Sequence, residues 1–151
     1  MATQSELDVA YLRMAYVWSS LSKAQRKKVG CLIVKDGAII SDGFNGTPKG
    51  FDNCCELEEE GSLVTKDEVL HAESNAISKL AQGTQSSNGA TMYITIAPCM
   101  ECAKLIIQAG IRKVVFREAY RSIEGLILLK RAGIEIDQVK VIYNDFVGKY
   151  A

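Results

Sequence analysis

The chain of 151 residues contains a single histidine and two prolines, and it carries no excess of charge of either sign. Its 18 basic and 18 acidic residues give a formal net charge of zero. Domains whose main partner is a nucleic-acid backbone are usually strongly basic, so this balance predicts no nucleic-acid partner. The sequence also lacks a run of about 18 apolar residues, the length that a membrane-spanning helix needs, and we expect no membrane partner.

The N-terminus has neither the basic region nor the apolar region of a secretory signal, which predicts a cytoplasmic protein. Five cysteines are an odd number for a disulfide framework, so a reducing compartment is expected. The length favours one domain over residues 1–151, and 48% hydrophobic residues are enough for a core.

The only histidine, His71, stands two residues before Glu73 and 28 residues before Cys99, the first cysteine of a Pro-Cys-x-x-Cys stretch that ends at Cys102. One imidazole and two thiolates form a three-ligand set for Zn²⁺, and the open fourth position of such a site is typical of catalysis. A water held there has its pKa lowered to about 7, which supplies hydroxide at neutral pH. We therefore predict one catalytic Zn²⁺ bound by His71, Cys99 and Cys102, with Glu73 moving protons between the water and a substrate nitrogen.

Apolar periodicity predicts a helix over 5–21 with Ser5 as its N-cap, and Trp18 is expected in the core. A hairpin around Asp36-Gly37 should follow, and then an irregular acidic excursion over 51–65. Strands are expected at 29–34, 38–41, 91–95, 112–116 and 134–141, and later helices at 71–80 (capped by Thr65 or Asp67), 99–109 and 122–132.

This order of elements predicts an α/β fold, a mixed five-stranded sheet covered by helices. Both groups of metal ligands fall in the first turn of a helix. Free N–H groups and a partial positive charge at helix N-termini favour thiolates at Cys99 and Cys102, and side chains at i and i+3 share a helix face.

The complete pattern His-x-Glu…Pro-Cys-x-x-Cys resembles that of the zinc-dependent nucleobase deaminases. Three further stretches are similar to deoxycytidylate deaminases: residues 22–30, the loop over 43–48, and the acidic insertion from Asn53 to His71. The resemblance implies a three-layer α-β-α cytidine deaminase-like fold. It also implies hydrolysis of dCMP to dUMP and ammonia, which supplies dUMP for thymidylate synthesis.

Candidate substrate residues surround this motif. Arg26 leads a short basic run before the first strand and is suited to a phosphate. Asn45 offers a donor and an acceptor to a sugar hydroxyl or a phosphate, and Tyr120 resembles the aromatic residue that relatives place near the substrate. The simpler interpretations are a solvated connector, a turn residue and a surface aromatic, respectively. The resemblance also assigns Ala72 and Pro98 to the substrate site.

The resemblance further implies a hexamer that dCTP activates and dTTP inhibits, with Mg²⁺ accompanying the triphosphates. The effector site is expected near Asp42, Phe44 and Gly46, although relatives usually have tyrosine in place of Phe44. Some relatives hold a second, structural zinc with a further histidine, which this chain lacks. The remaining thiols that could serve such a site are those of Cys31, Cys54 and Cys55.

Two other functions are compatible with parts of the pattern. A deaminase of RNA bases would need a basic groove along the RNA backbone. A non-catalytic zinc-binding interaction module would need four protein ligands. A lone Cys-x-x-Cys pair can also be a redox pair or half of a structural zinc site.

Overall fold

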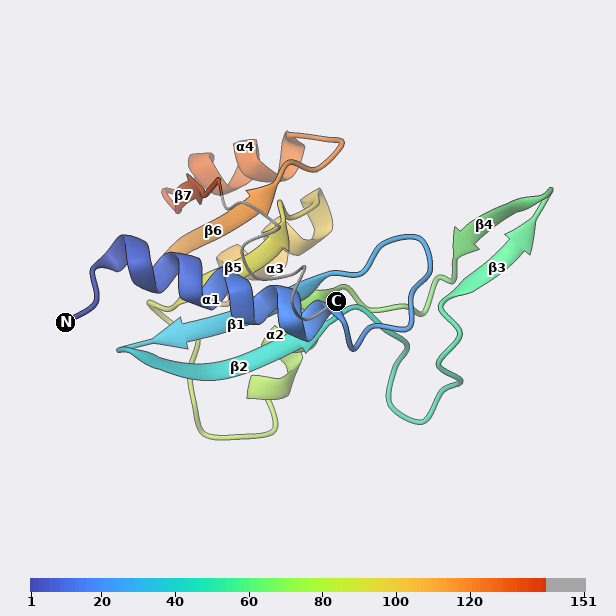
Figure 1. Cartoon of the computed structure of the whole chain (residues 1–151), viewed down its shortest axis with the longest axis horizontal. Helices are drawn as coiled ribbons and strands as arrows, with labels where there is room; N and C mark the ends of the chain where they lie inside the picture. The colour runs from blue at the N-terminus through green and yellow to red at the C-terminus, as the bar shows by residue number, and fades with distance from the viewer. Residues whose placement is uncertain (141–151) are drawn as a thin grey trace.

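The computed structural model describes residues 1–140 (Figure 1). Its elements in chain order are α1 (Gln4–Ser19), β1 (Gly30–Lys35), β2 (Ala38–Phe44), β3 (Glu56–Glu59), β4 (Ser62–Thr65), α2 (Ala72–Leu80), β5 (Thr91–Ile96), α3 (Met100–Gln108), β6 (Lys113–Glu118), α4 (Glu124–Arg131) and β7 (Glu135–Gln138). Five strands form one sheet in the order β2-β1-β5-β6-β7. β1 is antiparallel to both of its neighbours, whereas β5, β6 and β7 are parallel, so the sheet is mixed. The predicted end of the last strand, at 141, lies outside the described residues.

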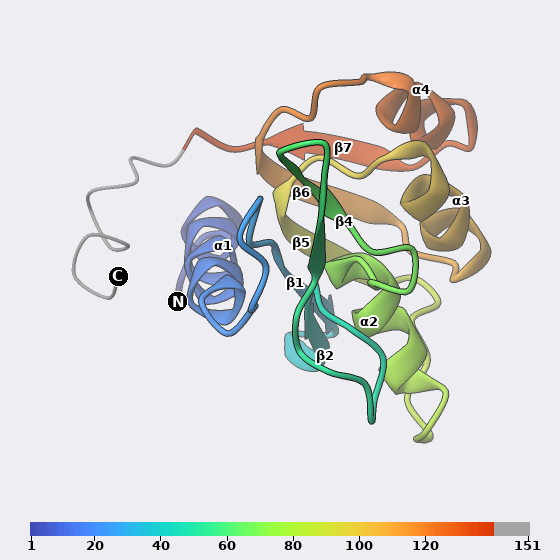
Figure 2. The ribbon, with the colours of Figure 1, turned by 90° about the vertical axis from the view of Figure 1, so that its right-hand side faces the viewer.

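Helices cover both faces of this sheet. α1 lies on one face, and α2, α3 and α4 lie on the other (Figure 2). Because side chains alternate along a strand, β1 contributes to two cores: Cys31 and Ile33 pack on the side of α2, and Leu32 and Val34 pack on the side of α1. The arrangement confirms the predicted three-layer α-β-α fold.

α1 begins two residues earlier than expected, counted from its N-cap. Its N-cap is Thr3, not Ser5, and Thr3 forms a capping box with Glu6. The helix buries Leu12 and Ala15, whereas the apolar residues whose spacing predicted the helix are largely on the outside. Leu7, Met14 and Val17, for example, are exposed. Trp18 is half-buried. No helix among residues 1–140, α1 included, is long and apolar enough to cross a membrane.

The segment expected to be an irregular excursion instead contains a second, two-stranded sheet, β3–β4. It extends away from the body of the molecule (Figure 1). Glu60 and Gly61 connect its strands with φ angles of 49° and 80°, as a hairpin turn with two left-handed residues requires. The acidic sequence of β3 has low strand propensity, which is why the pattern of residues did not predict it.

Candidate active site

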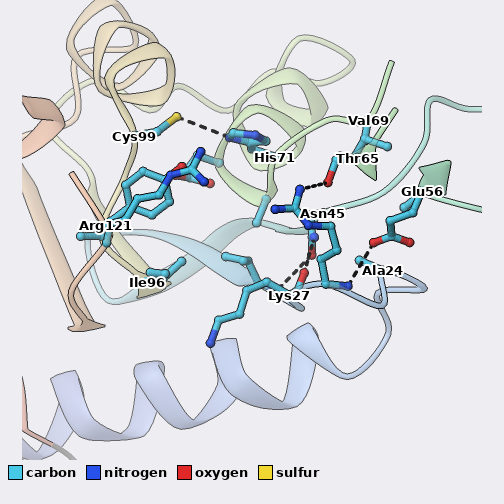
Figure 3. A pocket seen from close by; sticks show the side chains of 17 residues that line it. Ala24, Lys27, Asn45, Glu56, Thr65, Val69, His71, Ile96, Cys99 and Arg121 are labelled. Carbon is cyan, nitrogen blue, oxygen red and sulfur yellow. Dashed lines mark hydrogen bonds between the residues drawn. The ribbon is translucent and has the colours of Figure 1, made fainter. Parts of the chain in front are cut away.

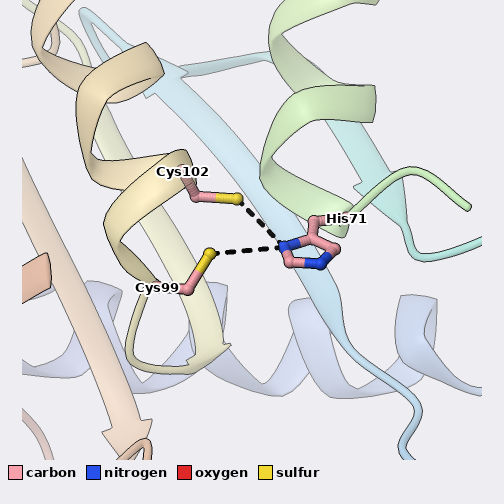
Figure 4. Close-up of side chains that lie close together, drawn as sticks. All are labelled: His71, Cys99 and Cys102. Atoms are coloured by element: carbon pink, nitrogen blue, oxygen red, sulfur yellow. Dashed lines mark hydrogen bonds between the residues drawn. The ribbon is translucent and has the colours of Figure 1, made fainter. Parts of the chain in front are cut away.

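Two helix starts bring the three predicted metal ligands together. His71 is the N-cap of α2, and Cys99 is the N-cap of α3. Cys102 follows one turn later on α3. In Figure 4 both sulfur atoms point towards the imidazole ring of His71 from the neighbouring helix. The two helix starts meet because β5 and the segment before α2 end at the same edge of the sheet. The backbone pairing of Leu70 with Gly46 helps to fix the segment before α2 there.

The distances within this cluster suit a tetrahedral zinc ion. His71 Nδ1 lies 3.2 Å from Cys102 Sγ and 3.5 Å from Cys99 Sγ. All three ligand atoms lie within 4.8 Å of one another. Tetrahedral geometry with ordinary Zn–N and Zn–S bonds places nitrogen and sulfur about 3.6 Å apart. The three residues therefore fit a zinc ion without rearrangement of either helix.

Of the two thiols in the cluster, Cys99 is the one held as a thiolate, because the hydrogen bond with Cys99 and burial raise the pKa of Cys102 instead. The hydrogen bond with Cys102, followed by the one with His71, lowers the pKa of Cys99 to about 3. The hydrogen bond with Cys99 raises the pKa of His71. Because a thiolate is the form that binds metal, Cys99 is ready to act as a ligand at neutral pH.

Glu73 is the buried acid of the site. It is the second residue of α2, its side chain lies on the pocket wall, and it is 4% exposed. Burial is the main cause that raises its pKa to about 7, while the charge of His71 acts in the opposite direction. A carboxyl group with a pKa near neutrality can both take up and release a proton, as a proton-transferring residue must.

The cluster opens into a pocket of about 350 Å³. In the view of Figure 3, His71 and Cys99 lie at one end, and Glu56 and Ala24 lie at the other, with Asn45 between them. The size is within the range of sites for small molecules, about 300–1,000 Å³. One wall is thus formed by the metal cluster and the other by the connector between α1 and β1.

The predicted residue Asn45 holds this connector in place. Its Nδ2 donates to the carbonyl oxygen of Lys27 at 2.8 Å, and its Oδ1 accepts from the backbone N–H of Val29 at 2.8 Å. An asparagine amide retains a second N–H and a second lone pair after two such bonds. Asn45 therefore has a structural role and also keeps polar capacity on the pocket wall, where it lies.

Three cations line the pocket: Arg26, Lys27 and Arg121. Arg26 donates from Nη1 to Thr65 Oγ1 at 3.0 Å, and Lys27 pairs with Glu118 at 3.0 Å. The guanidinium of Arg121 lies 5.4 Å from the ring centre of Tyr120, which also lines the pocket. The sequence pattern predicted Arg26 and Tyr120 as substrate residues but not Arg121. The position of Arg121 directly after Tyr120 was the one feature that could have indicated it.

Other predicted residues lie at or behind the wall. Ala72 lines the pocket, whereas Pro98 is buried in the connection between β5 and α3. The candidate effector residues are not part of the pocket lining. Asp42 forms an ion pair with Lys79, Phe44 ends β2, and Gly46 exchanges two backbone hydrogen bonds with Leu70.

The cysteines that could bind a second metal do not lie together in a cluster of potential ligands. Among residues 1–140, the group formed by His71 and the two motif cysteines is the one cluster of at least three potential ligands. Cys31 is in the core, Cys54 is exposed, and Cys55 is buried. The described part of the chain thus has one candidate metal site, and it offers three ligands.

A mixed sheet that presents one histidine, two cysteines and a buried glutamate at two helix starts defines the class of zinc-dependent nucleobase deaminases. Comparison with known proteins narrows this class. Residues 5–118 match the family model for the cytidine and deoxycytidylate deaminase zinc-binding region. The chain belongs to this family.

Individual relatives agree with this family assignment. The chain is 36% identical to the deoxycytidylate deaminase of Enterobacteria phage T4. The alignment, 168 positions long with its gaps, covers 85% of this chain and 87% of that protein. It is 34% identical to the deoxycytidylate deaminase of Saccharomyces cerevisiae, but it spans only 44% of that longer protein. The crystal structure of a dCMP deaminase from cyanophage S-TIM5, in complex with dCMP and dUMP, is 42% identical and superimposes with a TM-score of 0.85 over 91% of this chain and 100% of that one.

Proposed function

We propose that this protein is a zinc-dependent dCMP deaminase, which converts dCMP and water to dUMP and ammonia and thereby supplies dUMP for thymidylate synthesis. The observation that carries the proposal is the joint position of the metal cluster and Glu73 on one wall of a pocket that also contains Arg26 and Arg121. Relatives named as deoxycytidylate deaminases and the similar structure with dCMP and dUMP support the same substrate.

The residues at the metal end suit deamination at C4 of cytosine. Zinc, held by His71, Cys99 and Cys102, would supply an activated water as the nucleophile. Glu73 takes a proton from this water and gives it to N3 of the base as the C4–N3 double bond is lost. Glu73 then passes the second proton of the water to the amino group, which leaves as ammonia. Burial raises the pKa of Glu73 to about 7 and keeps this carboxyl group away from bulk solvent.

The cations at the pocket suit a monophosphate. Guanidinium groups bind phosphate oxygens with paired hydrogen bonds, and Arg26 uses one N–H on Thr65 and has others to offer. Arg121 provides a second guanidinium on the lining. Lys27 is partly neutralised by Glu118. A few placed cations rather than a broad basic face are consistent with the zero net charge of the chain.

A substrate panel tests the proposal. The zinc-loaded protein is incubated with cytosine, deoxycytidine, dCMP, dCTP and adenosine compounds, and ammonia release is measured. We expect dCMP to have the highest kcat/KM. A preference for an adenosine compound, together with saturable binding of tRNA at physiological salt, would instead favour an RNA deaminase.

The non-enzymatic alternative has its own test. A closed zinc module requires four protein ligands, whereas the described cluster contains three. X-ray absorption spectroscopy of the zinc protein should show two sulfur ligands, one imidazole and one light ligand that does not come from the chain. Four protein ligands, together with no deamination of any substrate, would refute the proposal that this protein is an enzyme.

We also propose that the enzyme is a hexamer that dCTP activates, with Mg²⁺, and dTTP inhibits. The backbone pairing between Gly46 and Leu70 supports a route for this control, because Leu70 directly precedes the metal ligand His71. A nucleotide bound beside Asp42, Phe44 and Gly46 could thus shift the start of α2. Light scattering should give the mass of a hexamer. dCTP should lower the KM for dCMP, and dTTP should raise it. A monomer whose kinetics ignore both nucleotides would contradict this assignment.

A further inference from the structure

A buried carboxylate lies where the β3–β4 hairpin begins. Glu56 is the first residue of β3 and is only 6% exposed. Its Oε2 accepts hydrogen bonds from the backbone N–H groups of Gln25, at 2.9 Å, and Arg26, at 3.1 Å. Its Oε1 is buried and has no hydrogen-bond partner within residues 1–140. The hydrogen bonds of this carboxylate therefore go to the connector between α1 and β1.

The same end of the hairpin also holds the side chain of Arg26. Thr65 is the cross-strand partner of Glu56 in the β3–β4 register, and Thr65 Oγ1 accepts from Arg26 Nη1 at 3.0 Å. One cross-strand pair thus contacts Arg26 twice, at its backbone and at its guanidinium. Both members of the pair line the pocket together with Arg26. Figure 3 shows these contacts as dashed lines near Glu56 and Thr65.

Burying a carboxylate costs free energy unless its bonds compensate for the lost water. Here the compensating bonds fix two consecutive residues of a connector that is neither helix nor strand. An arginine side chain has many rotamers, and holding it before a ligand arrives reduces the entropy that binding must overcome. The pair therefore has a physical consequence for any ligand that contacts Arg26.

We propose that Glu56 is a positioning residue for substrate recognition: it fixes the backbone at Gln25 and Arg26 so that the Arg26 guanidinium is held ready for the 5′-phosphate of the nucleotide. The inference rests on the proposed function in assigning a phosphate to Arg26. Glu56 itself does not touch the substrate and acts through Arg26.

Kinetics on two substrates test this role. For Glu56→Ala, the KM for dCMP should rise about tenfold, because hydrogen bonds to a charged group are lost, while kcat stays within about threefold. Deoxycytidine, which has no phosphate, should keep its kcat/KM within about twofold. Glu56→Gln should lie between wild type and Glu56→Ala, since its amide oxygen still accepts from the connector. The exposed Glu58, on the same strand, provides the control Glu58→Ala, which should leave both substrates unchanged.

A double variant separates positioning from a general structural effect. If Glu56 acts through Arg26, Glu56→Ala combined with Arg26→Ala should raise the KM for dCMP no further than Arg26→Ala alone. Effects that multiply, or an equal loss of activity on dCMP and deoxycytidine, would overturn the proposal. If Glu56→Ala does not fold, Glu56→Gln carries the same comparison.

A measurement without substrate completes the test. Hydrogen exchange at the Gln25 and Arg26 amides should be about tenfold faster in Glu56→Gln than in wild type, because a charge-assisted bond becomes a neutral one. Unchanged exchange overturns the inference whatever the substrate is. A wild-type enzyme that turns over dCMP and deoxycytidine equally well removes the phosphate assignment, and the role of Glu56 with it, before any variant is made.

Discussion

A Cβ atom at Gly125 would lie 2.4 Å from the carbonyl oxygen of Pro98. α4 therefore packs directly against the backbone that leads into Cys99, whose carbonyl oxygen would be 2.9 Å from the same Cβ. Both neighbours are backbone atoms, which cannot turn away as a flexible side chain can. The absence of a side chain at Gly125 thus allows the close approach of α4 to the start of α3.

Gly125→Ala should displace the start of α3 and weaken zinc binding. We expect zinc affinity to fall by about tenfold, as for other residues that support metal ligands, and stability to fall by about 1–3 kcal/mol from overpacking. Competitive zinc titration and thermal unfolding measure the two effects. Gly83→Ala is the control, because a Cβ there meets no atom within 4 Å. Unaltered zinc affinity in Gly125→Ala would mean that α4 does not support the site.

Cys99→Ala should remove the bound metal. With two ligands left, we expect less than about a tenth of an equivalent of zinc after dialysis, compared with one equivalent for wild type. Cys54→Ala, which changes an exposed thiol outside the cluster, should keep the full equivalent. Metal analysis of the purified proteins gives the answer. A full, tightly held equivalent in Cys99→Ala would contradict the ligand set.

Glu73→Gln should separate metal binding from catalysis. The amide has the shape of the carboxyl group but cannot transfer protons, so kcat for dCMP should fall by about 10⁴-fold or more, while zinc content and dCMP binding are retained. Assays of ammonia release measure kcat, and metal analysis measures the zinc content. Glu101→Gln is the control, since Glu101 is also in the first turn of a helix beside the cluster but is exposed and paired with Lys104. Loss of zinc in Glu73→Gln would make Glu73 a ligand and refute the proton-transfer role.

Arg26→Ala should affect the phosphate end of the substrate. Loss of a charge-assisted contact should raise the KM for dCMP by about tenfold or more and leave deoxycytidine turnover nearly unchanged. Lys28→Ala is a matched control from the same basic run, because Lys28 does not belong to the pocket lining. Steady-state kinetics on both substrates decide the matter. If Arg26→Ala reduces activity on both equally, Arg26 supports structure and another cation binds the phosphate.

The chemistry of the site could be predicted from the sequence because it depends on few residues in a local order. His71 precedes Glu73 by two positions, and Cys99 precedes Cys102 by three, so each pair shares one helix start wherever that helix lies. The alternation of helices and strands likewise predicted a mixed sheet covered by helices, and the family resemblance added the three-layer arrangement. The predicted ligands are indeed gathered within 4.8 Å.

The rest depended on contacts between distant segments. α1 carries apolar residues on more than one side, and only packing against β1 and β5 decided that Leu12 is buried and Met14 is not. Glu56 lies 30 positions from Arg26 in the chain, in an acidic hairpin that local propensity did not predict. The sequence by itself determined which residues could form the zinc site and the proton-transferring acid that we propose, because these properties depend on residue type and local spacing. Only the tertiary structure decided which residues form the opposite wall of the pocket, because that wall exists only when the connector, the hairpin and the helix starts meet.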